Sequence, residues 1–457
     1  MGAGKSTIGR EAARLAERPF VDTDEEIEHR YGPITRIFEQ DGEAAFRRIE
    51  EEVAAEVLCA DEPAVIALGG GAVTSEATRA RLARRAFTVW VDVDVEEAWR
   101  RVRRSDRPLG RDEEAFRRLY EERREGYVLA ADGMAEDAEE VLLGALGIVV
   151  EPGALAELAG FVGAEDGEVA LVADPRVLEL HRPELGERRA SVHPVPRGER
   201  AKSATVAGRL WEELSLARDG TLVALGGGCT TDLAGFVAAT YLRGVRWVAV
   251  PTTLVGQVDA AIGGKTAIDL EKGKNLVGAF HYPDGVVIDP TVLRTLPARE
   301  RRAGMAEVVK TGLLAGSEPW RDADEPMVRA CAAFKAAVCL GDPFDEGRRA
   351  ILNLGHTFAH ALEAASDYRL SHGEAVALGL LGALRLSGLP TDVVEEVLAP
   401  EPARLDRDRA WAVLQRDKKA RAGRVRLVLL DRPGDARFPV ELPAGEVRRA
   451  LGELIAD

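Results

Sequence analysis

The sequence has few cysteines, no long apolar run and no excess of positive charge, and each absence excludes a class of protein. Its 457 residues include only four cysteines, none in a Cys-x-x-Cys pair, so a disulfide scaffold is excluded and a reducing compartment is expected. No apolar stretch approaches the roughly 18 residues of a membrane span, and the first residues contain no apolar signal region. We therefore expect a cytoplasmic protein with no membrane partner.

The charge and composition are those of an acidic globular protein. With 61 Lys and Arg against 77 Asp and Glu, the formal net charge is −16, which gives no overall attraction to nucleic acid or to anionic membranes. Hydrophobic residues make up 46% and charged residues 30%, so a disordered or collagen-like chain is excluded. The length predicts two to four domains of about 100–200 residues each.

The first residues have the pattern of a glycine-rich turn that opens into a helix. Apolar residues at helical spacing, Ile8, Ala12 and Leu15, follow the turn. In such a turn, backbone N–H groups hold phosphate oxygens, a lysine reaches the β- and γ-phosphates, and a serine hydroxyl ligates Mg²⁺. A chance glycine turn on a surface helix is the alternative. The pattern predicts an ATP site made of Gly2, Gly4, Lys5, Ser6 and Thr7.

Two further segments place polar groups or glycines at the ends of apolar stretches. Asp22 and Asp24 stand at i and i+2, and a strand end would point both carboxylates to one side; a pair of solvated helix caps is the alternative. Residues 65–68 predict a buried parallel strand that runs into Gly69-Gly70-Gly71, where a backbone can approach a ligand closely.

Residues 1–145 resemble shikimate kinase. The matching motifs are GAGKST, the Asp22/Asp24 pair, GExxFRxxE at Gly42–Glu50, the glycine run, Arg107-Pro108-Leu109 and Arg123-x3-Tyr127. The resemblance implies that Lys5 and Ser6 bind ATP and Mg²⁺ with help from Asp22, that Arg107 closes over the γ-phosphate, and that Asp24 accepts the proton of the substrate hydroxyl. It implies that shikimate lies among Asp24, Arg48, Gly70, Gly71 and Arg123.

This part departs from the family in one respect. A phosphate loop has the pattern G-x4-G-K-[ST], and counting back from Gly4 places its first glycine before Met1. The strand that should lead into the loop, normally central in a parallel sheet, is missing as well. We therefore expect a parallel kinase sheet without its first strand, and a kinase part of reduced competence.

The second part begins with alternating strands and helices. Residues 168–174 and 221–225 predict buried strands, and the second runs through Gly226-Gly227-Gly228 into a helix at residues 233–240. A strand, a glycine turn and a helix favour a dinucleotide-phosphate site, although the spacing is not G-x-G-x-x-G. Residues 263–266 and 273–275 predict a basic, glycine-rich loop region, either solvated or an anion site.

Three of the seven histidines lie within 17 residues. His356 and His360 stand at i and i+4, on one face of a helix, and Ser371-x-x-Glu374 is a capping box that puts His372 in a first helical turn. Such a cluster favours a metal site over core packing. Spacing alone suggests His356 and His360 as the ligand pair, with a carboxylate from elsewhere.

Residues from about 147 to the end resemble 3-dehydroquinate synthase. The motifs that match are GExxK at Gly198–Lys202, GGGxxxDLAGFxAAT at Gly226–Thr240, PTTL at Pro251–Leu254, QVDAxxGGKT at Gln257–Thr266, GKN at Gly273–Asn275, AGMAEVVKxG at Ala303–Gly312, LNLGHTFxHxLE at Leu352–Glu363 and HGEAVA at His372–Ala377. Thr231 stands where many relatives have glycine.

The resemblance implies a complete set of site residues. The ligands of Zn²⁺, with Co²⁺ as a substitute, would be Glu307, His356 and His372, which makes His360 a substrate contact instead of a ligand. NAD would lie among Asp174, Glu199, Lys202, Gly227, Gly228, Asp232, Thr252, Thr253, Lys265, Lys274 and Thr295. The substrate would lie among Asp259, Lys265, Lys274, Asn275, Lys310, Lys335, Arg349, Asn353 and His360, with Arg243 and one of Lys418 and Lys419 at its phosphate.

These resemblances predict a bifunctional enzyme of the shikimate pathway. Residues 1–145 would phosphorylate shikimate with ATP and Mg²⁺. Residues 146–457 would convert 3-deoxy-D-arabino-heptulosonate 7-phosphate to 3-dehydroquinate, with an NAD-binding α/β domain to about residue 300 and a helical metal and substrate domain beyond it. A homodimer through the second part is expected. The alternatives are another sugar-phosphate cyclase fused to a degenerate kinase module, and a polyol dehydrogenase that would accumulate NADH.

Overall fold

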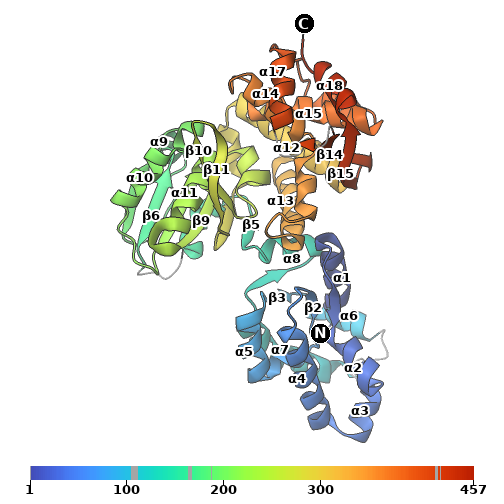
Figure 1. The fold of residues 1–457 in the computed structure, drawn as a ribbon. Coiled ribbons are helices and arrows are strands. Elements are labelled where there is room, and N and C mark those ends of the chain that lie inside the picture. Colours follow the sequence, from blue (N-terminus) through green and yellow to red (C-terminus); the bar gives the residue numbers. More distant parts are fainter. Residues whose placement is uncertain are drawn as a thin grey trace. The chain divides into compact units, whose positions relative to one another are not determined.

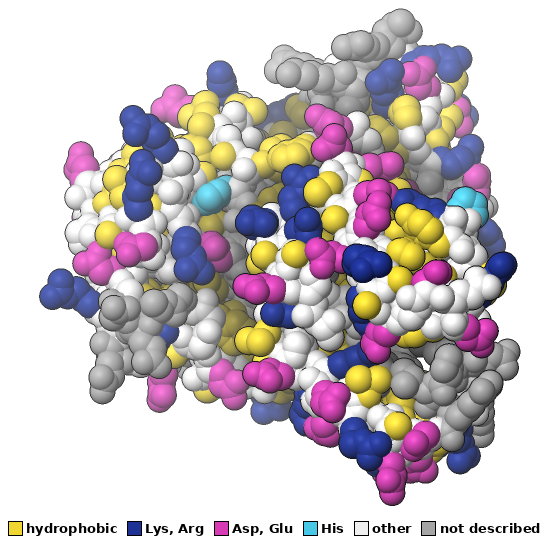
Figure 2. Space-filling view, turned by 90° about the horizontal axis from the view of Figure 1, so that it is seen from below, with side chains coloured by type: hydrophobic (Ala, Val, Ile, Leu, Met, Phe, Trp, Pro, Cys, Tyr) yellow, Lys and Arg dark blue, Asp and Glu magenta, His cyan; other side chains and the backbone are white. Residues whose placement is uncertain are grey.

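The chain consists of two compact units, residues 1–145 and 146–457, in a computed structural model (Figure 1). The structure describes residues 2–103, 112–162, 167–186, 188–416, 420–421 and 424–456. Among these residues, no helix is long and apolar enough to cross a membrane. On the face shown in Figure 2, acidic and basic side chains are interspersed, so the negative charge of the sequence does not gather into one patch on that face.

The first unit contains short parallel strands between helices. In chain order its elements are α1 (Lys5–Ala16), β1 (Phe20–Asp22), α2 (Thr23–Tyr31), α3 (Ile34–Gln40), α4 (Glu43–Cys59), β2 (Val65–Ala67), α5 (Glu76–Arg85), β3 (Val89–Val91), α6 (Val95–Val102), α7 (Glu113–Ala130), β4 (Gly133–Ala135) and α8 (Ala138–Gly144). Helix α4 places Phe46, Glu50 and Val53 on one buried face, which is the spacing of an amphipathic helix.

The strands of the first unit form two separate pairs. Strand β1 pairs in parallel with β2, and β3 with β4. Among the described residues β2 and β3 have no further partner. All three residues of β2 and all three of β3 line one cavity of about 210 Å³. The predicted parallel strands are confirmed, but here they make two pairs instead of one continuous sheet.

The second unit is built on a six-stranded parallel sheet. Its strands are β5 (Ile148–Val150), β6 (Val169–Ala173), β7 (Ala190–Pro194), β8 (Thr221–Gly226), β9 (Arg246–Pro251) and β12 (Gly285–Ile288), in the order β5-β12-β9-β8-β6-β7. The connecting helices are α9 (Pro175–Leu180), α10 (Ala204–Glu213) and α11 (Gly228–Thr240). Every residue of β6 and β8 is buried, as expected for strands with helices on both faces.

The predicted loop region leads into an antiparallel hairpin of β10 (Lys265–Leu270) and β11 (Gly273–Phe280). The prediction is confirmed at Gly263 and Gly264, which precede β10 with φ of +99° and +67°. It is wrong for residues 265–266 and 273–275, which begin the two strands. A Cβ on Gly278 would lie 2.3 Å from the carbonyl oxygen of Thr266 on the opposite strand, so this further glycine permits close pairing of the two strands.

The rest of the second unit is mainly helical. Its elements are α12 (Ala298–Ala315), α13 (Asp324–Gly341), α14 (His356–Ala365), α15 (His372–Ser387), α16 (Asp392–Val397), α17 (Arg407–Arg416), α18 (Ala444–Gly452), and a small antiparallel sheet of β13 (Ala420–Arg421), β14 (Arg424–Arg432) and β15 (Asp435–Pro443). The buried core joins α14 and α15 to this sheet through Phe358, Leu380 and Leu429. The predicted helical domain is confirmed, with a sheet that the sequence analysis did not predict.

Candidate active sites

The glycine-rich turn of the first unit leads into α1, as predicted. Gly4 is the N-cap of α1 with a left-handed backbone, φ +89°, and the first turn of the helix contains no acidic residue. The Ser6 hydroxyl donates a hydrogen bond to the Asp22 carboxylate at 2.5 Å. The turn, the adjacent Lys5 and a carboxylate therefore converge at a positive helix end, which suits a nucleotide phosphate and its Mg²⁺.

The two predicted aspartates occupy different elements. Strand β1 ends at Asp22, whose carboxylate caps α2 by accepting a hydrogen bond from the Asp24 amide at 3.0 Å. Asp24 itself lies in the first turn of α2, so the prediction of two carboxylates on one strand end is wrong. Helix α2 already begins at Thr23, directly after Asp22, because an aspartate is a strong N-cap.

The glycine run after β2 lies against charged side chains. A Cβ on Gly69 would lie 2.6 Å from Glu50 Oε1 and 2.7 Å from Asp24 Oδ1. The hydroxyl of Tyr127 donates a hydrogen bond to the Gly70 carbonyl at 2.8 Å. On the preceding turn of the same helix, Arg123 is buried, and its Nε has no hydrogen-bond partner among the described residues. A buried guanidinium with one N–H still unpartnered suits a carboxylate ligand.

Arg47, and not Arg48, lies beside this run. A Cβ on Gly71 would overlap the Arg47 guanidinium, and Arg47 Nη1 donates a hydrogen bond to Glu50 at 2.6 Å. Burial raises the pKa of Glu50, although Arg47 opposes this effect. Arg48 is exposed on α4. The predicted position is therefore corrected by one residue. Three other predicted residues, Arg107, Lys418 and Lys419, lie outside the described residues.

In the second unit, predicted residues gather at the carboxyl ends of neighbouring strands. Asp174 follows β6, Gly227 and Gly228 follow β8, and Thr252 and Thr253 follow β9. The chain leaves β6 toward β7 on one side and returns to β8 on the other. Such a reversal of strand order opens the crevice in which α/β sheets bind nucleotides. Here α11 begins, at Gly228, with no acidic residue in its first turn.

These glycines are required by close packing. A Cβ on Gly227 would lie 2.9 Å from Thr253 Cγ2, and one on Gly228 would lie 2.8 Å from Ala260 Cβ. Both contacts are shorter than side chains tolerate. The glycines thus leave the start of α11 open to a pyrophosphate, so the residues present fit a dinucleotide.

A buried lysine ties this crevice to the hairpin. Lys202 Nζ donates hydrogen bonds to Asp232 at 2.6 Å and to Asn275, and Lys274 Nζ donates one to Glu199 at 3.1 Å. Burial lowers the pKa of Lys202, but Asp232 outweighs it, so the pKa lies above its usual value. The lysine stays charged and holds these predicted residues together.

Two predicted residues of the second unit lie apart from these contacts. Thr295 accepts or donates a hydrogen bond with His181 Nε2 at 2.6 Å, at the end of a short helical turn, Pro290–Thr295. Arg243 is exposed, and no described contact joins it to the other predicted residues. Their roles stay predictions.

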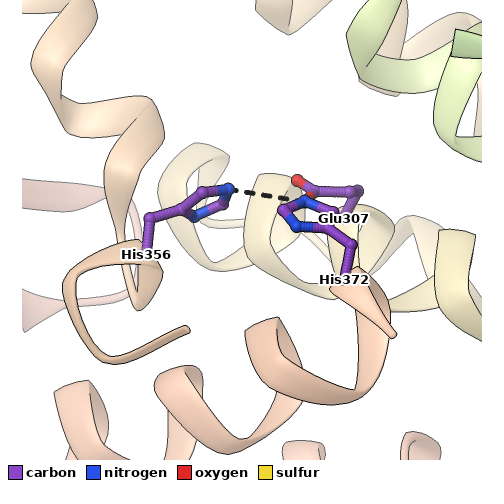
Figure 3. Close-up of side chains that lie close together, drawn as sticks. All are labelled: Glu307, His356 and His372. Atoms are coloured by element: carbon purple, nitrogen blue, oxygen red, sulfur yellow. Dashed lines mark hydrogen bonds and ion pairs between the residues drawn. The ribbon is translucent and has the colours of Figure 1, made fainter. Parts of the chain in front are cut away.

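Glu307, His356 and His372 come together from three helices, α12, α14 and α15 (Figure 3). One donor atom of each lies within 4.8 Å of the other two. Glu307 Oε1 lies 3.1 Å from His372 Nε2 and 3.6 Å from His356 Nε2. The predicted capping box of Ser371 and Glu374 is confirmed, and it fixes His372 in the first turn of α15.

The donor set fits Zn²⁺. One carboxylate and two imidazoles are common ligands of catalytic zinc, and three protein ligands leave coordination positions open. Glu307 is fully buried, and His356 Nδ1 lies 3.2 Å from the Leu354 carbonyl, which leaves Nε2 for a metal. His360 is exposed, and its ring centroid lies 5.5 Å from that of His356, at the margin of the cluster.

The surrounding charges keep two of the three donors, Glu307 and His356, in the forms that a metal needs. Burial lowers the pKa of His372, the third donor, but Glu307 and Glu363 outweigh it and raise the pKa to about 10, so a metal must displace its proton. Burial raises the pKa of Glu307, but Lys310 and the two histidines outweigh it, and the pKa lies well below the usual value. Burial, with Lys310, lowers the pKa of His356 to about 3. The carboxylate is therefore ionised and His356 neutral near neutral pH, as metal binding requires.

Two buried lysines extend the cluster toward the sheet. Lys310 contacts Glu307 and lies 3.9 Å from Asp259, and Lys335 Nζ donates a hydrogen bond to Asp259 Oδ1 at 2.6 Å. Burial raises the pKa of Asp259, but both lysines outweigh it and hold the pKa below its usual value. The two lysines thus face two carboxylates, Asp259 and Glu307, and present buried ammonium groups that are placed to donate hydrogen bonds to an anionic substrate.

The remaining residues predicted to contact the substrate are Arg349, Lys265 and Asn353. Arg349 is buried and donates hydrogen bonds to the carbonyls of Gly263 at 2.7 Å and Pro343 at 3.1 Å, while its Nε has no partner among the described residues. Lys265 pairs with Asp345 at 2.6 Å, and Asn353 caps its own turn through Ala350. Arg349 thus adds a buried positive charge. Burial raises the pKa of the neighbouring Asp342 carboxyl, but backbone N–H groups and the charge of Arg349 outweigh it, and the pKa lies below its usual value.

The comparisons with known proteins follow the two units. The family model for shikimate kinase matches residues 1–142, and the models for the N-terminal and C-terminal parts of 3-dehydroquinate synthase match residues 192–303 and 304–420. The 3-dehydroquinate synthase of Enterococcus faecalis (strain V583) is 37% identical over 340 residues, which are 66% of this chain and 95% of that protein. The chain belongs to the 3-dehydroquinate synthase family. It also carries a shikimate kinase domain, so it is a fusion of two shikimate-pathway enzymes.

Solved structures of other cyclases share the fold of the synthase part. The 2-epi-5-epi-valiolone synthase of Streptomyces hygroscopicus subsp. jinggangensis, solved with NAD⁺ and Zn²⁺, is 27% identical with a TM-score of 0.58, over 67% of this chain and 96% of its own. A 2-deoxy-scyllo-inosose synthase, solved with carbaglucose-6-phosphate, NAD⁺ and Co²⁺, is 23% identical with a TM-score of 0.60, over the same shares of both chains. The latter likeness concerns the fold alone.

Proposed function

We propose that residues 146–457 convert 3-deoxy-D-arabino-heptulosonate 7-phosphate to 3-dehydroquinate and phosphate, with NAD⁺ and Zn²⁺ bound. The observation that carries the proposal is the convergence of Glu307, His356 and His372 beside Lys310 and Lys335. When bound, Zn²⁺ supplies a Lewis acid and NAD⁺ a hydride acceptor that returns the hydride, so neither is consumed.

The protein's own residues bind and orient a substrate with a carboxylate and a phosphate. Such a substrate carries at least two negative charges, and the buried Lys310, Lys335 and Arg349 supply positive charge in a site of low dielectric. Asp259 keeps the two lysines charged and close to each other. We propose that these groups hold the acid and phosphate ends while the reacting carbon faces the nicotinamide.

The test uses the full chain with heptulosonate phosphate, NAD⁺ and added Zn²⁺ or Co²⁺. Release of phosphate should match formation of 3-dehydroquinate one to one, without net accumulation of NADH. NADH accumulation with a polyol would favour a dehydrogenase instead. The chain should lose this activity on removal of metal by a chelator and regain it on addition of Zn²⁺, since the metal site is part of the mechanism.

A cyclase of another pathway is the second candidate, because the 2-epi-5-epi-valiolone synthase described above, a solved neighbour at 27% identity, is such an enzyme. The discriminating assay offers glucose 6-phosphate, an aldose phosphate, and ketose phosphates without a carboxylate in place of the heptulosonate. These sugars lack the carboxylate that Lys310, Lys335 and Arg349 would attract. We expect turnover with the heptulosonate phosphate alone. If the chain instead prefers a sugar phosphate without a carboxylate, the alternative replaces the proposal.

We propose further that residues 1–145 transfer the γ-phosphate of ATP to shikimate with Mg²⁺. Supporting observations are the Ser6–Asp22 hydrogen bond at the start of α1 and the arginines beside the glycine run, Arg47 and Arg123. Phosphoryl transfer needs mainly positioning and charge stabilisation. Shikimate-dependent formation of ADP by the full chain tests this activity, and its absence in a preparation that still forms 3-dehydroquinate would overturn it.

Two broader features are also proposed. We expect a homodimer formed through residues 146–457, checked by light scattering of the purified chain, and a cytoplasmic location, checked by fractionation of the source cells. The family relationship supports both.

A further inference from the structure

Glu363 lies behind one of the three donors of the metal cluster, and the sequence analysis did not include it among the site residues. It is two helical turns after His356 on α14 and is almost fully buried, with 5% of its surface exposed. Its Oε1 lies 3.5 Å from Nδ1 of His372, which belongs to α15. Burying a carboxylate costs free energy unless a partner of opposite charge or a hydrogen-bond donor accompanies it. The burial of Glu363 beside His372 therefore requires an explanation.

The orientation of His372 supplies one. Its Nε2 lies 3.1 Å from Glu307 Oε1, on the side of the cluster, and its Nδ1 lies on the side of Glu363. Only a nitrogen without a proton can ligate a metal. A carboxylate that accepts the Nδ1–H places the proton there, frees Nε2 and fixes the plane of the ring.

The same arrangement occurs at the other imidazole with a different acceptor. His356 Nδ1 lies 3.2 Å from the Leu354 carbonyl, which is backbone. Both histidines therefore turn Nε2 toward the cluster. The Nδ1 of His356 faces a main-chain acceptor, and the Nδ1 of His372 faces a side-chain acceptor. Substitution can remove only the second of these acceptors, and this makes the role of Glu363 testable.

Glu363 has a second neighbour, Lys274 of β11. Lys274 Nζ lies 3.9 Å from Glu363 Oε1 and 3.1 Å from Glu199 Oε2. Glu199 belongs to the predicted cofactor crevice. Glu363 thus stands between a donor of the metal cluster and the hairpin, whose Lys274 also contacts Glu199, and one carboxylate contacts both.

We infer that Glu363 is a positioning residue of the metal centre: its carboxylate orients His372 by accepting the Nδ1–H and joins this histidine to Lys274. The inference rests on the proposed metal site. Loss of such a partner of a ligand lowers metal affinity by about 10- to 100-fold in other metalloproteins.

The experiment measures Zn²⁺ affinity by competition with a chelator, and the absorption spectrum of bound Co²⁺, on the full chain without substrate. The variants are Glu363→Gln, His356→Ala and Glu396→Gln. Glu396 is the matched control, because the same substitution there changes an exposed glutamate of α16 that contributes nothing to the metal cluster. Circular dichroism checks that each variant is folded.

We expect E363Q to bind Zn²⁺ about 10- to 100-fold more weakly with an altered Co²⁺ spectrum, E396Q to match the original chain, and H356A to lose tight binding. Wild-type affinity and spectrum in E363Q, with H356A still defective, would overturn the inference and leave the proposed metal site intact. Failure of the original chain to bind Zn²⁺, or tight binding by H356A, would overturn both.

A measurement on the unsubstituted chain covers the case in which E363Q does not fold. With ¹⁵N-labelled histidine, the two imidazoles whose signals respond to Zn²⁺ should both carry their proton on Nδ1. A Zn²⁺-bound histidine protonated on Nε2 would overturn the inference without any variant.

Discussion

The two units place glycine runs after parallel strands, but they support those strands differently. In residues 146–457, β6 and β8 pair on both edges and every residue of both is buried. In residues 1–145, β2 and β3 each pair on one edge among the described residues, and of their six residues only Ala67 is buried. Parallel strands are normally buried on both faces, so the synthase site has the firmer support.

The comparison shows that the presence of a motif and the packing of the strands beside it are separate properties. Both glycine runs contain residues that match their family, and both lie beside charged side chains. The difference lies in how much packed structure holds them. Each of the following experiments changes one unit.

The largest effect is expected for His356→Ala. Removing one of three donors should abolish metal-dependent formation of 3-dehydroquinate, to less than about a hundredth of the original rate, because even outer partners of ligands are worth 10- to 100-fold. Shikimate-dependent ADP formation should not change. His29→Ala, an exposed position on α2, is the control. Metal-dependent synthase activity that survives in H356A would contradict the assigned cluster.

The next effect concerns packing in the second unit. A Cβ on Gly379 would lie 2.1 Å from the Gly355 carbonyl oxygen, at the contact between α15 and α14. The backbone there cannot move aside easily, so Gly379→Ala should lower the free energy of unfolding of this unit by about 3 kcal/mol and weaken Zn²⁺ binding. Urea unfolding checks this.

Gly445→Ala on α18 is the control for that experiment, because nothing lies within 4 Å of the added Cβ. It should not lower the free energy of unfolding and should raise it by at most about 1 kcal/mol, because alanine is favoured over glycine in a helix. Equal stability of the two variants would mean that the helices of the metal site are less tightly packed than this structure indicates.

A smaller effect distinguishes two neighbouring arginines of the first unit. Arg47 contacts Glu50 beside the glycine run, whereas Arg48 is exposed. A hydrogen bond to a charged group contributes about 1.5–3 kcal/mol, so Arg47→Ala should lower kcat/KM for shikimate by roughly 10- to 150-fold and Arg48→Ala by much less. Steady-state kinetics checks the pair, and a larger loss in R48A would restore the original prediction.

Much of the second site could be predicted from the sequence because its residues stand at regular positions. The capping box fixed the start of α15, and helical spacing put His356 and His360 on one face, but spacing alone selected His360 as a ligand. The selection between His360 and His372 needs the crossing of α14 with α15, which is tertiary. Glu363 ends one of the matching motifs but was assigned no role. Its separation of seven residues from His356 places both on the same face of the helix.

In the first unit, the sequence contained the information that was needed, but the prediction did not use it. Arg47 and Arg48 are adjacent, and only the phase of α4 separates them. That phase was available, since Phe46, Glu50 and Val53 are spaced as one buried face and Arg47 stands three residues before Glu50. The start of α2 at Thr23 was missed because an aspartate suits a strand end and an N-cap equally well.

The smallest effect tests whether the first unit can be strengthened alone. Gly126 lies inside α7, and an added Cβ would meet Val73 at 3.5 Å, an ordinary contact. Alanine in a helix interior is favoured over glycine by about 1 kcal/mol, so Gly126→Ala should raise the unfolding midpoint of residues 1–145 by about 2–4 °C. Calorimetry should show this shift in the first of two transitions and none in the second. A shift of both would mean that the units unfold as one, and the contrast in strand support would then have no consequence for stability.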